Sequence, residues 1–200
     1  MKRLMDLILS SLLIMMLSPF FLLISFFIVI DSKGGVFFLQ ERIGLNRKRF
    51  KIIKFRTMVK NAEALGSGVF VNRNDSRITK IGFFLRKFSL DELPQIVNVI
   101  KGDMSFVGPR PPVVFHPYPI DDYPSDYLNR FSVKPGITGL AQISGRTNIT
   151  WEERFSFDLE YVKNYSFVLD VHIIFLTVLR VLGSNEVYPT EKYIKNNHKI

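Results

Sequence analysis

The chain contains no cysteine, and its three histidines are scattered along it (His116, His172 and His198). Disulfide bonds and thiolate metal sites are therefore excluded, and a histidine-based zinc site is not favoured. The sequence also lacks a Walker-type glycine loop, a Rossmann fingerprint, a Gly-x-Ser-x-Gly elbow and a His-Glu-x-x-His motif. Nothing in it indicates sequence-specific reading of nucleic acid, so we expect no nucleic-acid partner.

What the chain does have is positive charge combined with apolar character. Its formal net charge is +9, and its mean hydropathy is nevertheless positive, at +0.14. This combination suits anionic lipid headgroups or a phosphorylated ligand better than it suits a soluble nucleic-acid binder. A length of 200 residues is enough for one compact domain and an anchor.

An apolar segment opens the chain. Between Leu4 and Ile30 the only ionisable residue is Asp6. A continuous helix of this length would reach roughly 40 Å, which exceeds the hydrocarbon core of a bilayer, about 30 Å thick. The run is too long for a signal peptide and no small-x-small cleavage site follows it, so we expect it to remain as an anchor over residues 1–31.

The topology of this anchor is open from the residues alone. Basic residues flank it on both sides: Lys2 and Arg3 precede it, and it is followed by Lys33, Arg42, Arg47, Lys48, Arg49, Lys51, Lys54 and Arg56. The positive-inside rule draws both flanks to the cytoplasm. Ser18-Pro19 lies near the middle and predicts a break or kink, which would let two helical arms enter and leave by one face. A kinked transmembrane helix is the alternative.

The remainder predicts an α+β fold that is mostly helical, with a small β element. Short strands are expected at 36–39 and 50–55, and helices at 80–86, 89–100, 151–164 and 167–182. The last segment is apolar but interrupted by Asp170, His172 and Arg180, which favours an amphipathic helix at the membrane interface. We predict a cytoplasmic, membrane-associated catalytic domain over residues 32–183 and a polar tail over 184–200.

Adjacent carboxylates at Asp91 and Glu92 are the first candidates for chemistry. Ser89-x-x-Glu92 is also a capping-box pattern, so these acids could simply begin a helix. In the functional interpretation, the helix N-terminus keeps Asp91 ionised and Glu92 holds a divalent cation. An ionised aspartate can attack phosphorus and form an acyl phosphate.

Basic residues supply candidates for binding phosphate. Arg110 lies between two prolines, whose rings stiffen the backbone for a bidentate contact, and Arg146 follows a glycine. Either could instead be an ordinary surface arginine. Lys54 and Arg56 could neutralise phosphates, although contact with lipid headgroups is the simpler interpretation for a basic segment behind an anchor.

Taken together, these motifs resemble the bacterial sugar transferase family, the monotopic polyprenyl-phosphate phosphoglycosyl transferases. The resemblance covers nearly the whole chain in order and is carried by Lys2-Arg3-x-x-Asp6, Ser18-Pro19, QERIG (40–44), FKIIKFRTM (50–58), FLR (84–86), SLDELPQ (89–95), NVIKGDMSFVGPRP (98–111), KPGITG (134–139) and Gly145-Arg146. It indicates the minimal, single-domain form and a re-entrant anchor broken at Ser18 and Pro19. It also implies a location at the cytoplasmic face of the bacterial inner membrane.

The resemblance implies a two-step reaction. Asp91 would attack the sugar-bearing phosphorus of a UDP-sugar and expel UMP, and a polyprenyl phosphate, such as undecaprenyl phosphate, would then take the phosphosugar. Glu92 would bind Mg²⁺, and Arg86, Arg110 and Arg146 would lie near the phosphates. Two alternatives stand beside it: a membrane glycosyltransferase that releases UDP, and a non-catalytic basic adaptor.

One position departs from the family pattern. Where family members often carry a glutamate shortly after the Pro-Arg-Pro motif, this chain has Phe115-His116-Pro117. The departure concerns substrate contacts in this loop and leaves the nucleophile unaffected.

Overall fold

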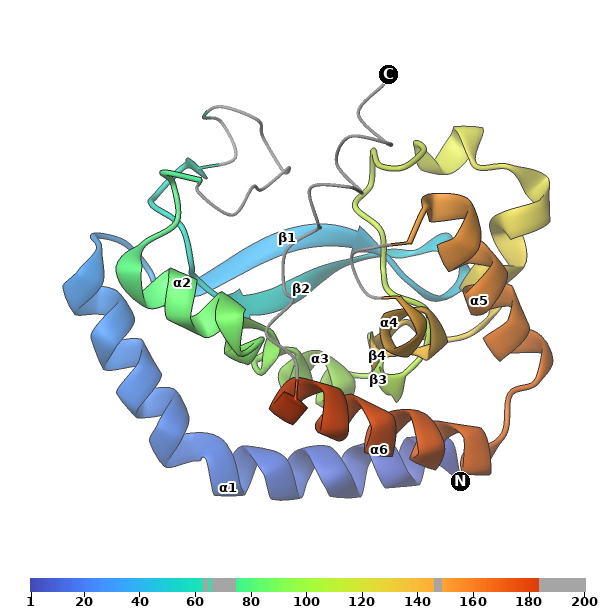
Figure 1. Ribbon diagram of the computed structural model, residues 1–200, viewed down its shortest axis with the longest axis horizontal. Helices are drawn as coiled ribbons and strands as arrows, with labels where there is room; N and C mark the ends of the chain where they lie inside the picture. Colours follow the sequence, from blue (N-terminus) through green and yellow to red (C-terminus); the bar gives the residue numbers. More distant parts are fainter. Residues whose placement is uncertain (63–64, 66–74, 146–148, 184–200) are drawn as a thin grey trace.

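The computed structural model describes residues 1–62, 65, 75–145 and 149–183 (Figure 1). The predicted tail (184–200) and Arg146 lie outside the described residues. In chain order the helices and strands are α1 (Lys2–Asp31), β1 (Phe37–Ile43), β2 (Arg49–Phe55), α2 (Lys80–Lys87), α3 (Gln95–Lys101), β3 (Ser105–Val107), β4 (Gly136–Thr138), α4 (Leu140–Ser144), α5 (Trp151–Lys163) and α6 (Phe167–Gly183). The expected α+β, mostly helical fold is confirmed.

The β element consists of two small sheets. β1 and β2 form an antiparallel hairpin in which Phe37 pairs with Phe55 and Ile43 with Arg49. β3 and β4 pair in parallel. Six of the ten prolines lie in the stretch 108–124, whose only helical element is one turn of 3-10 helix, Ile120–Asp122. A second 3-10 segment, Ser125–Ser132, follows it.

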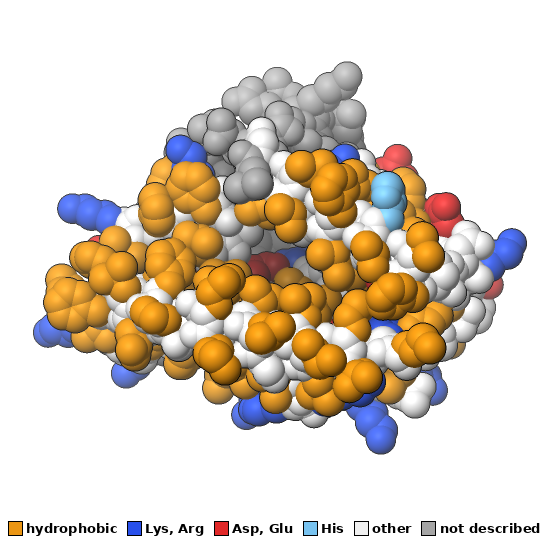
Figure 2. Space-filling model, turned by 90° about the horizontal axis from the view of Figure 1, so that it is seen from below, with side chains coloured by type: hydrophobic (Ala, Val, Ile, Leu, Met, Phe, Trp, Pro, Cys, Tyr) orange, Lys and Arg blue, Asp and Glu red, His pale blue; other side chains and the backbone are white. Residues whose placement is uncertain are grey.

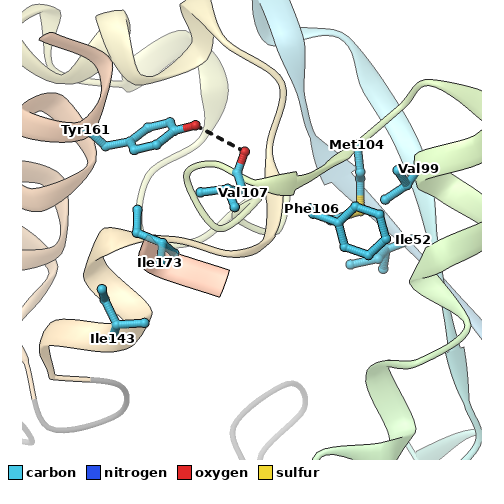
Figure 3. Close-up of a cluster of buried hydrophobic side chains, with 8 residues drawn as sticks. All are labelled: Ile52, Val99, Met104, Phe106, Val107, Ile143, Tyr161 and Ile173. Atoms are coloured by element: carbon cyan, nitrogen blue, oxygen red, sulfur yellow. Dashed lines mark hydrogen bonds between the residues drawn. The ribbon is translucent and has the colours of Figure 1, made fainter. Parts of the chain in front are cut away.

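The main core joins these sheets to the helices. Figure 3 shows its buried side chains, which come from β2, α3, β3, α4, α5, α6 and the turn before β3: Ile52, Val99, Met104, Phe106, Val107, Ile143, Tyr161 and Ile173. The hydroxyl of Tyr161 lies 3.3 Å from the carbonyl of Val107, and its shorter bond, to Asp170 over 2.7 Å, satisfies the one polar atom that this ring brings into the core.

α1 bends sharply but does not break. Hydrogen-bonded helix continues from Lys2 to Asp31 through Pro19, and Figure 1 shows the two arms meeting at a wide angle. Proline has no N–H, which deprives the carbonyl of Met15 of its usual donor. The Ser18 hydroxyl donates to that same carbonyl over 3.0 Å. Of the two predicted outcomes at Ser18-Pro19, a break or a kink, the structure shows the kink, and the Ser18 hydroxyl supplies a donor to the carbonyl that Pro19 leaves without one.

The N-terminal end of α1 is fastened to the globular body. Lys2 forms an ion pair with Asp170 of α6 at 2.6 Å. Arg3 donates to the carbonyl of Ile100 at the end of α3 over 2.7 Å. Asp6 is buried and accepts from the hydroxyl of Ser105 over 3.0 Å.

The C-terminal end of α1 is fastened to the same body. A carboxylate oxygen of Asp31 accepts from the backbone N–H of Ile81 at the start of α2 over 2.9 Å. Ile24 and Ile28 are buried against Phe55 and Leu85. Both ends of the apolar helix thus contact one globular unit.

The outer surface of three helices is unusually apolar. Seen from below, the molecule presents apolar side chains over most of its face, around a hollow in which acidic and basic side chains are visible (Figure 2). The large exposed residues include Leu12, Met15, Met16, Leu22 and Phe26 of α1, Phe83, Phe84 and Phe88 at α2, and Val168, Val171, Phe175 and Leu179 of α6. Within α6 the usual pattern is inverted, because Asp170 is buried while Val168 is exposed. Such a face is suited to lipid.

Candidate active site

A tight turn between α2 and α3 carries the two candidate carboxylates. Ser89 adopts the left-handed conformation with φ of 56°, and a single 3-10 turn, Leu90–Glu92, follows it. The predicted helix at 89–100 is thus shorter than expected: α3 begins at Gln95, after Pro94. Ser89 makes no side-chain cap bond here. The capping-box alternative is therefore wrong.

Glu92 is held by two cations. Nζ of Lys54 lies 2.7 Å from Oε1 of Glu92, and the Arg110 guanidinium donates to both carboxylate oxygens, over 2.7 and 3.2 Å. Burial opposes ionisation of Glu92, but Arg110 and Lys54 outweigh it and hold the pKa of Glu92 well below its usual value. Burial lowers the pKa of Lys54, and the charge of Glu92 counteracts that effect. The structure thus brings three predicted site residues together.

Asp91 is in a different electrostatic position. It forms no ion pair within the described part of the chain. Burial raises the pKa of Asp91 to about 6, the charge of Lys54 opposes this rise, and the charge of Glu92 adds to it. Ionisation of Asp91 stays a prediction, but its expected cause changes: the turn is not a helix start, and the charges of Lys54, Arg86 and Arg110 are what oppose the effect of burial.

The other predicted phosphate-binding residues have separate positions. Nε of Arg86 donates to the hydroxyl of Thr57 over 2.8 Å, and the charge of Arg86 contributes to lowering the pKa of Asp91. Arg56 lies elsewhere: its guanidinium donates to the carbonyls of Ser32 and Lys33 over 2.7 and 2.8 Å. Arg56 is therefore corrected from a phosphate ligand to a cap of α1, where the helix C-terminus attracts a cation.

Asn98 supports the site and was not predicted from the sequence. Its side chain is buried, donates to the carbonyl of Lys51 over 2.8 Å and accepts from the N–H of Ile53 over 3.0 Å. These bonds join α3 to β2 immediately before Lys54. The one feature of the sequence that could have indicated this role is the single polar residue, Asn98, within the apolar run from Ile96 to Ile100.

The segment that carries Arg110 is held by its carbonyls. Three of residues 109–112 are prolines and have no N–H to donate. Each of the four carbonyls has its own donor: the N–H of Gly136 bonds Pro109 (3.0 Å), the Arg130 guanidinium bonds Arg110 (2.9 Å), the Arg42 guanidinium bonds Pro111 (3.0 Å) and the N–H of Ile43 bonds Pro112 (3.1 Å). These four hydrogen bonds add to the stiffness that we expect from the prolines.

Arg130 belongs to a buried ion pair that sequence reasoning also missed. Its Nη2 lies 2.6 Å from Oδ2 of Asp158, and both side chains are 1% exposed. Its Nη1 donates to the Tyr123 hydroxyl over 3.2 Å. The pair connects the 3-10 segment Ser125–Ser132 with α5 and places a fixed donor against the carbonyl of Arg110.

The position that departs from the family pattern is packed. Nε2 of His116 accepts from the indole N–H of Trp151 over 3.1 Å. Trp151 packs in turn against Phe155, which is buried beside Tyr123 and Phe131. Burial lowers the pKa of His116, which favours the neutral ring that such an acceptor requires.

The donor set is compatible with Mg²⁺. No group of three or more acidic, histidine or cysteine ligands occurs among the residues that the structure describes. Mg²⁺ does not need one, because it commonly binds through one or two carboxylates together with water and substrate phosphates. Asp91 and Glu92 provide adjacent carboxylates, and the lowered pKa of Glu92 keeps it anionic.

Comparison with known proteins identifies the class. The family model for bacterial sugar transferases matches residues 1–184. The chain belongs to this family, as the motifs indicated.

Individual relatives are similar over most of the chain. It is 44% identical over 194 residues to a UDP-glucose:undecaprenyl-phosphate glucose-1-phosphate transferase of Klebsiella pneumoniae, covering 94% of this chain and 41% of the relative. It is 43% identical over 189 residues to the sugar transferase EpsL of Bacillus subtilis (strain 168), covering 94% and 91%. It is 40% identical over 201 residues to the exopolysaccharide production protein ExoY of Rhizobium meliloti (strain 1021), covering 94% and 88%. The chain thus spans about two fifths of the transferase from Klebsiella and most of the other two.

Among the described residues one helix, α1, is long and apolar enough to cross a membrane, and only 11% of its most apolar stretch of 18 residues is buried. With the family assignment, this indicates a membrane-associated protein.

Proposed function

We propose that this protein is a phosphoglycosyl transferase that moves a sugar 1-phosphate from a UDP-sugar to a polyprenyl phosphate. A carboxylate oxygen of Asp91 attacks the sugar-bearing phosphorus, the bond from that phosphorus to the UMP oxygen breaks, and UMP leaves. A phosphate oxygen of the polyprenyl phosphate then attacks the same phosphorus. The bond to Asp91 breaks, which restores the carboxylate and yields the polyprenyl diphosphate sugar.

The contrast between the two adjacent acids is the observation that carries this proposal. Glu92 is bound by Lys54 and Arg110, whereas Asp91 has no ion pair among the described residues but is close enough to the same cations for their charges to affect its pKa. An acid held by cations stays in place. An acid beside them without a bond is available to attack, which fits Asp91 as nucleophile.

The cations account for the remaining requirements. Phosphoryl transfer depends on positioning and charge neutralisation more than on acid-base chemistry. Arg110 and Lys54 provide fixed positive charge at the reacting group, and Arg86 adds a third cation. Glu92 would hold Mg²⁺, which, when bound, neutralises charge on the transferring phosphate.

The Klebsiella transferase is named for UDP-glucose and undecaprenyl phosphate. For this chain we propose the corresponding classes of substrate, a UDP-sugar and a polyprenyl phosphate. The sugar is left to experiment. The product class, a lipid diphosphate sugar, fits the first membrane step of a surface polysaccharide, which agrees with the name of the Rhizobium relative.

We also propose that α1 is re-entrant and that the catalytic domain lies at the cytoplasmic face of the bacterial inner membrane, among anionic headgroups. Two observations support this. Both ends of α1 are fastened to the same body, through Lys2 at one end and Asp31 at the other. Both flanks are basic, which keeps them on the cytoplasmic side.

The decisive activity experiment identifies the nucleotide released. Purified protein is incubated with Mg²⁺, undecaprenyl phosphate and a panel of UDP-sugars, beginning with UDP-glucose, and the nucleotide is separated by chromatography. We expect UMP, in amounts equal to the lipid diphosphate sugar. UDP as the sole nucleotide product would instead support a glycosyltransferase, and no turnover with any sugar would favour the adaptor.

The topology is tested by labelling, which the absence of native cysteine makes simple. One cysteine is inserted before Lys2 and another replaces the exposed Lys33 (Lys33→Cys), in separate proteins. An impermeant maleimide added to sealed inverted membranes should label both. Labelling from opposite faces would exclude the re-entrant arrangement.

A further inference from the structure

A cavity lined by both charged and apolar side chains lies away from the carboxylate pair, at the N-terminal end of α1. Its volume is about 260 Å³, and it is lined by Lys2, Arg3, Asp6, Leu45, Val107, Ser132, Val133, Lys134, Tyr161 and Tyr165. None of the candidate catalytic residues lines it. Figure 1 shows the N-terminus beside the start of α6, and Lys2 at this end of α1 pairs with Asp170 of α6.

Its acids are already occupied by donors of the protein. Asp170, behind the cavity, accepts from Lys2 over 2.6 Å and from the Tyr161 hydroxyl over 2.7 Å. Asp6 accepts from the hydroxyl of Ser105 and from the N–H of Phe106 over 3.0 and 3.2 Å. Neither carboxylate neutralises the other cations of the cavity.

Two of those cations converge. A carbon added at Gly102 would lie 3.4 Å from Nη2 of Arg3 and 3.5 Å from Nζ of Lys134, so the two charged groups approach one point. Arg3 bonds only carbonyls, those of Val99 and Ile100. In the described residues neither Arg3 nor Lys134 forms an ion pair. The carbonyls at the end of α3 already favour the charge of Arg3, and Lys134 adds a second positive charge beside them, so this edge of the cavity attracts an anion.

The surroundings indicate what carries that anion. Leu4 and Val168, on the helices that flank the cavity, are 64% and 76% exposed. Tyr165 is half-exposed at the rim, and an amphipathic ring of this kind favours the level of lipid headgroups. A soluble anion would not need this apolar border, whereas a lipid would use both the cations and the border.

We propose that this cavity binds the phosphate of an anionic phospholipid headgroup, with Arg3 and Lys134 as its ligands and the acyl chains along the exposed faces of α1 and α6. The proposal rests on the membrane association proposed above and is independent of which reaction Asp91 performs. Such a site would give the anchor a preferred lipid besides the acceptor substrate.

The test measures thermal unfolding of the full chain in neutral detergent with dihexanoyl phosphatidylglycerol as the probe. At ten times its dissociation constant the probe should raise Tm by about 3 °C. Dihexanoyl phosphatidylcholine should give less than half this shift, because its headgroup has no net charge. Lys134→Gln should abolish the shift. Lys134→Arg should retain it, and Lys48→Gln, which removes a charge outside the lining, should leave it unchanged.

Several outcomes would overturn the site. If the probe raised the Tm of Lys134→Gln as much as that of the unsubstituted protein, the lipid would bind elsewhere. The same conclusion would follow if Lys48→Gln lost as much of the Tm shift as Lys134→Gln. A shift of the same size with inorganic phosphate alone would overturn the lipid assignment in favour of a soluble phosphate. If Lys134→Gln is unstable without the probe, the test rests on Lys134→Arg. Loss of the Tm shift in Lys134→Arg would also contradict the proposal. UMP release is measured on the same samples, so a failure of the transferase proposal is recorded separately.

Discussion

Two of the ion-pair clusters among the described residues have opposite designs. In one, Glu92 faces two cations, Lys54 and Arg110, and the side chains are 14–36% exposed. In the other, Asp158 faces a single cation, Arg130, and both are 1% exposed. The pKa of Glu92 is held well below its usual value, whereas burial raises the pKa of Asp158 despite its partner.

The difference is the one expected between a site that binds a substrate and an ion pair that only stabilises the fold. An excess of cations with access to solvent can accept an additional anion such as a phosphate, while a closed one-to-one pair cannot. The two clusters are nevertheless connected, because Arg130 bonds the carbonyl of Arg110. The buried pair of Arg130 and Asp158 therefore helps to fix the position of Arg110 beside Glu92.

The largest effect is expected from Asp91→Asn, which removes the proposed nucleophile and changes almost no volume. UMP release should fall at least about a thousandfold, because residues that form covalent intermediates dominate the rate. Membrane binding should be unchanged. The exposed Asp121→Asn is the matched control, and substantial turnover in Asp91→Asn would contradict the assignment.

Arg110→Lys is expected to have the next largest effect. Lysine keeps the charge but loses the bidentate contact with Glu92, so kcat should fall about a hundredfold. Lys163→Arg, at an exposed position in the last turn of α5, is the control for a basic exchange. A kcat within twofold of that of the unsubstituted enzyme would show that catalysis does not need the bidentate contact of Arg110 with Glu92.

Arg130→Lys tests the connection between the clusters. A lysine can pair with Asp158 but cannot also reach the carbonyl of Arg110 with fixed geometry, so kcat should fall about tenfold with KM for the UDP-sugar nearly unchanged. Asp158→Asn should in addition lower the free energy of unfolding by about 3 kcal/mol, because it leaves Arg130 buried without its partner. A loss of stability in Arg130→Lys without any change in kcat would reduce the pair to a purely structural role.

The smallest effect on activity is expected from Arg56→Met. The substitution removes the cap of α1 but keeps an apolar stem, so the free energy of unfolding should fall by about 2 kcal/mol, measured by urea denaturation. UMP release per folded enzyme should be unchanged. A selective rise in KM for the UDP-sugar would restore Arg56 as a phosphate ligand.

Lys54 and Arg56 show where sequence reasoning succeeds and fails. Both are basic and two residues apart, which on a strand places them on one face. β2 ends at Phe55, however, and Arg56 turns to the carbonyls at the end of α1. Which partner a long cation meets depends on packing between segments far apart in the chain, and local pattern carries no information about it.

The site divides in the same way. Asp91, Glu92 and Arg110 could be predicted because their motifs are local. Asn98, Arg130 and Asp158 could not, since their bonds join distant segments, and no spacing in the sequence distinguishes them from ordinary surface residues. Arg146 stays a prediction, because it lies outside the described residues.

The fastening of α1 at both ends has a consequence for the membranes in which the enzyme can work. A helix that traverses a bilayer must match its hydrocarbon thickness, and mismatch costs free energy for each ångström. In the proposed topology α1 never reaches the opposite leaflet, so no such match is required. Turnover should therefore vary little between bilayers of short and long acyl chains, and the depth of Asp91 relative to the headgroups is set by the protein itself.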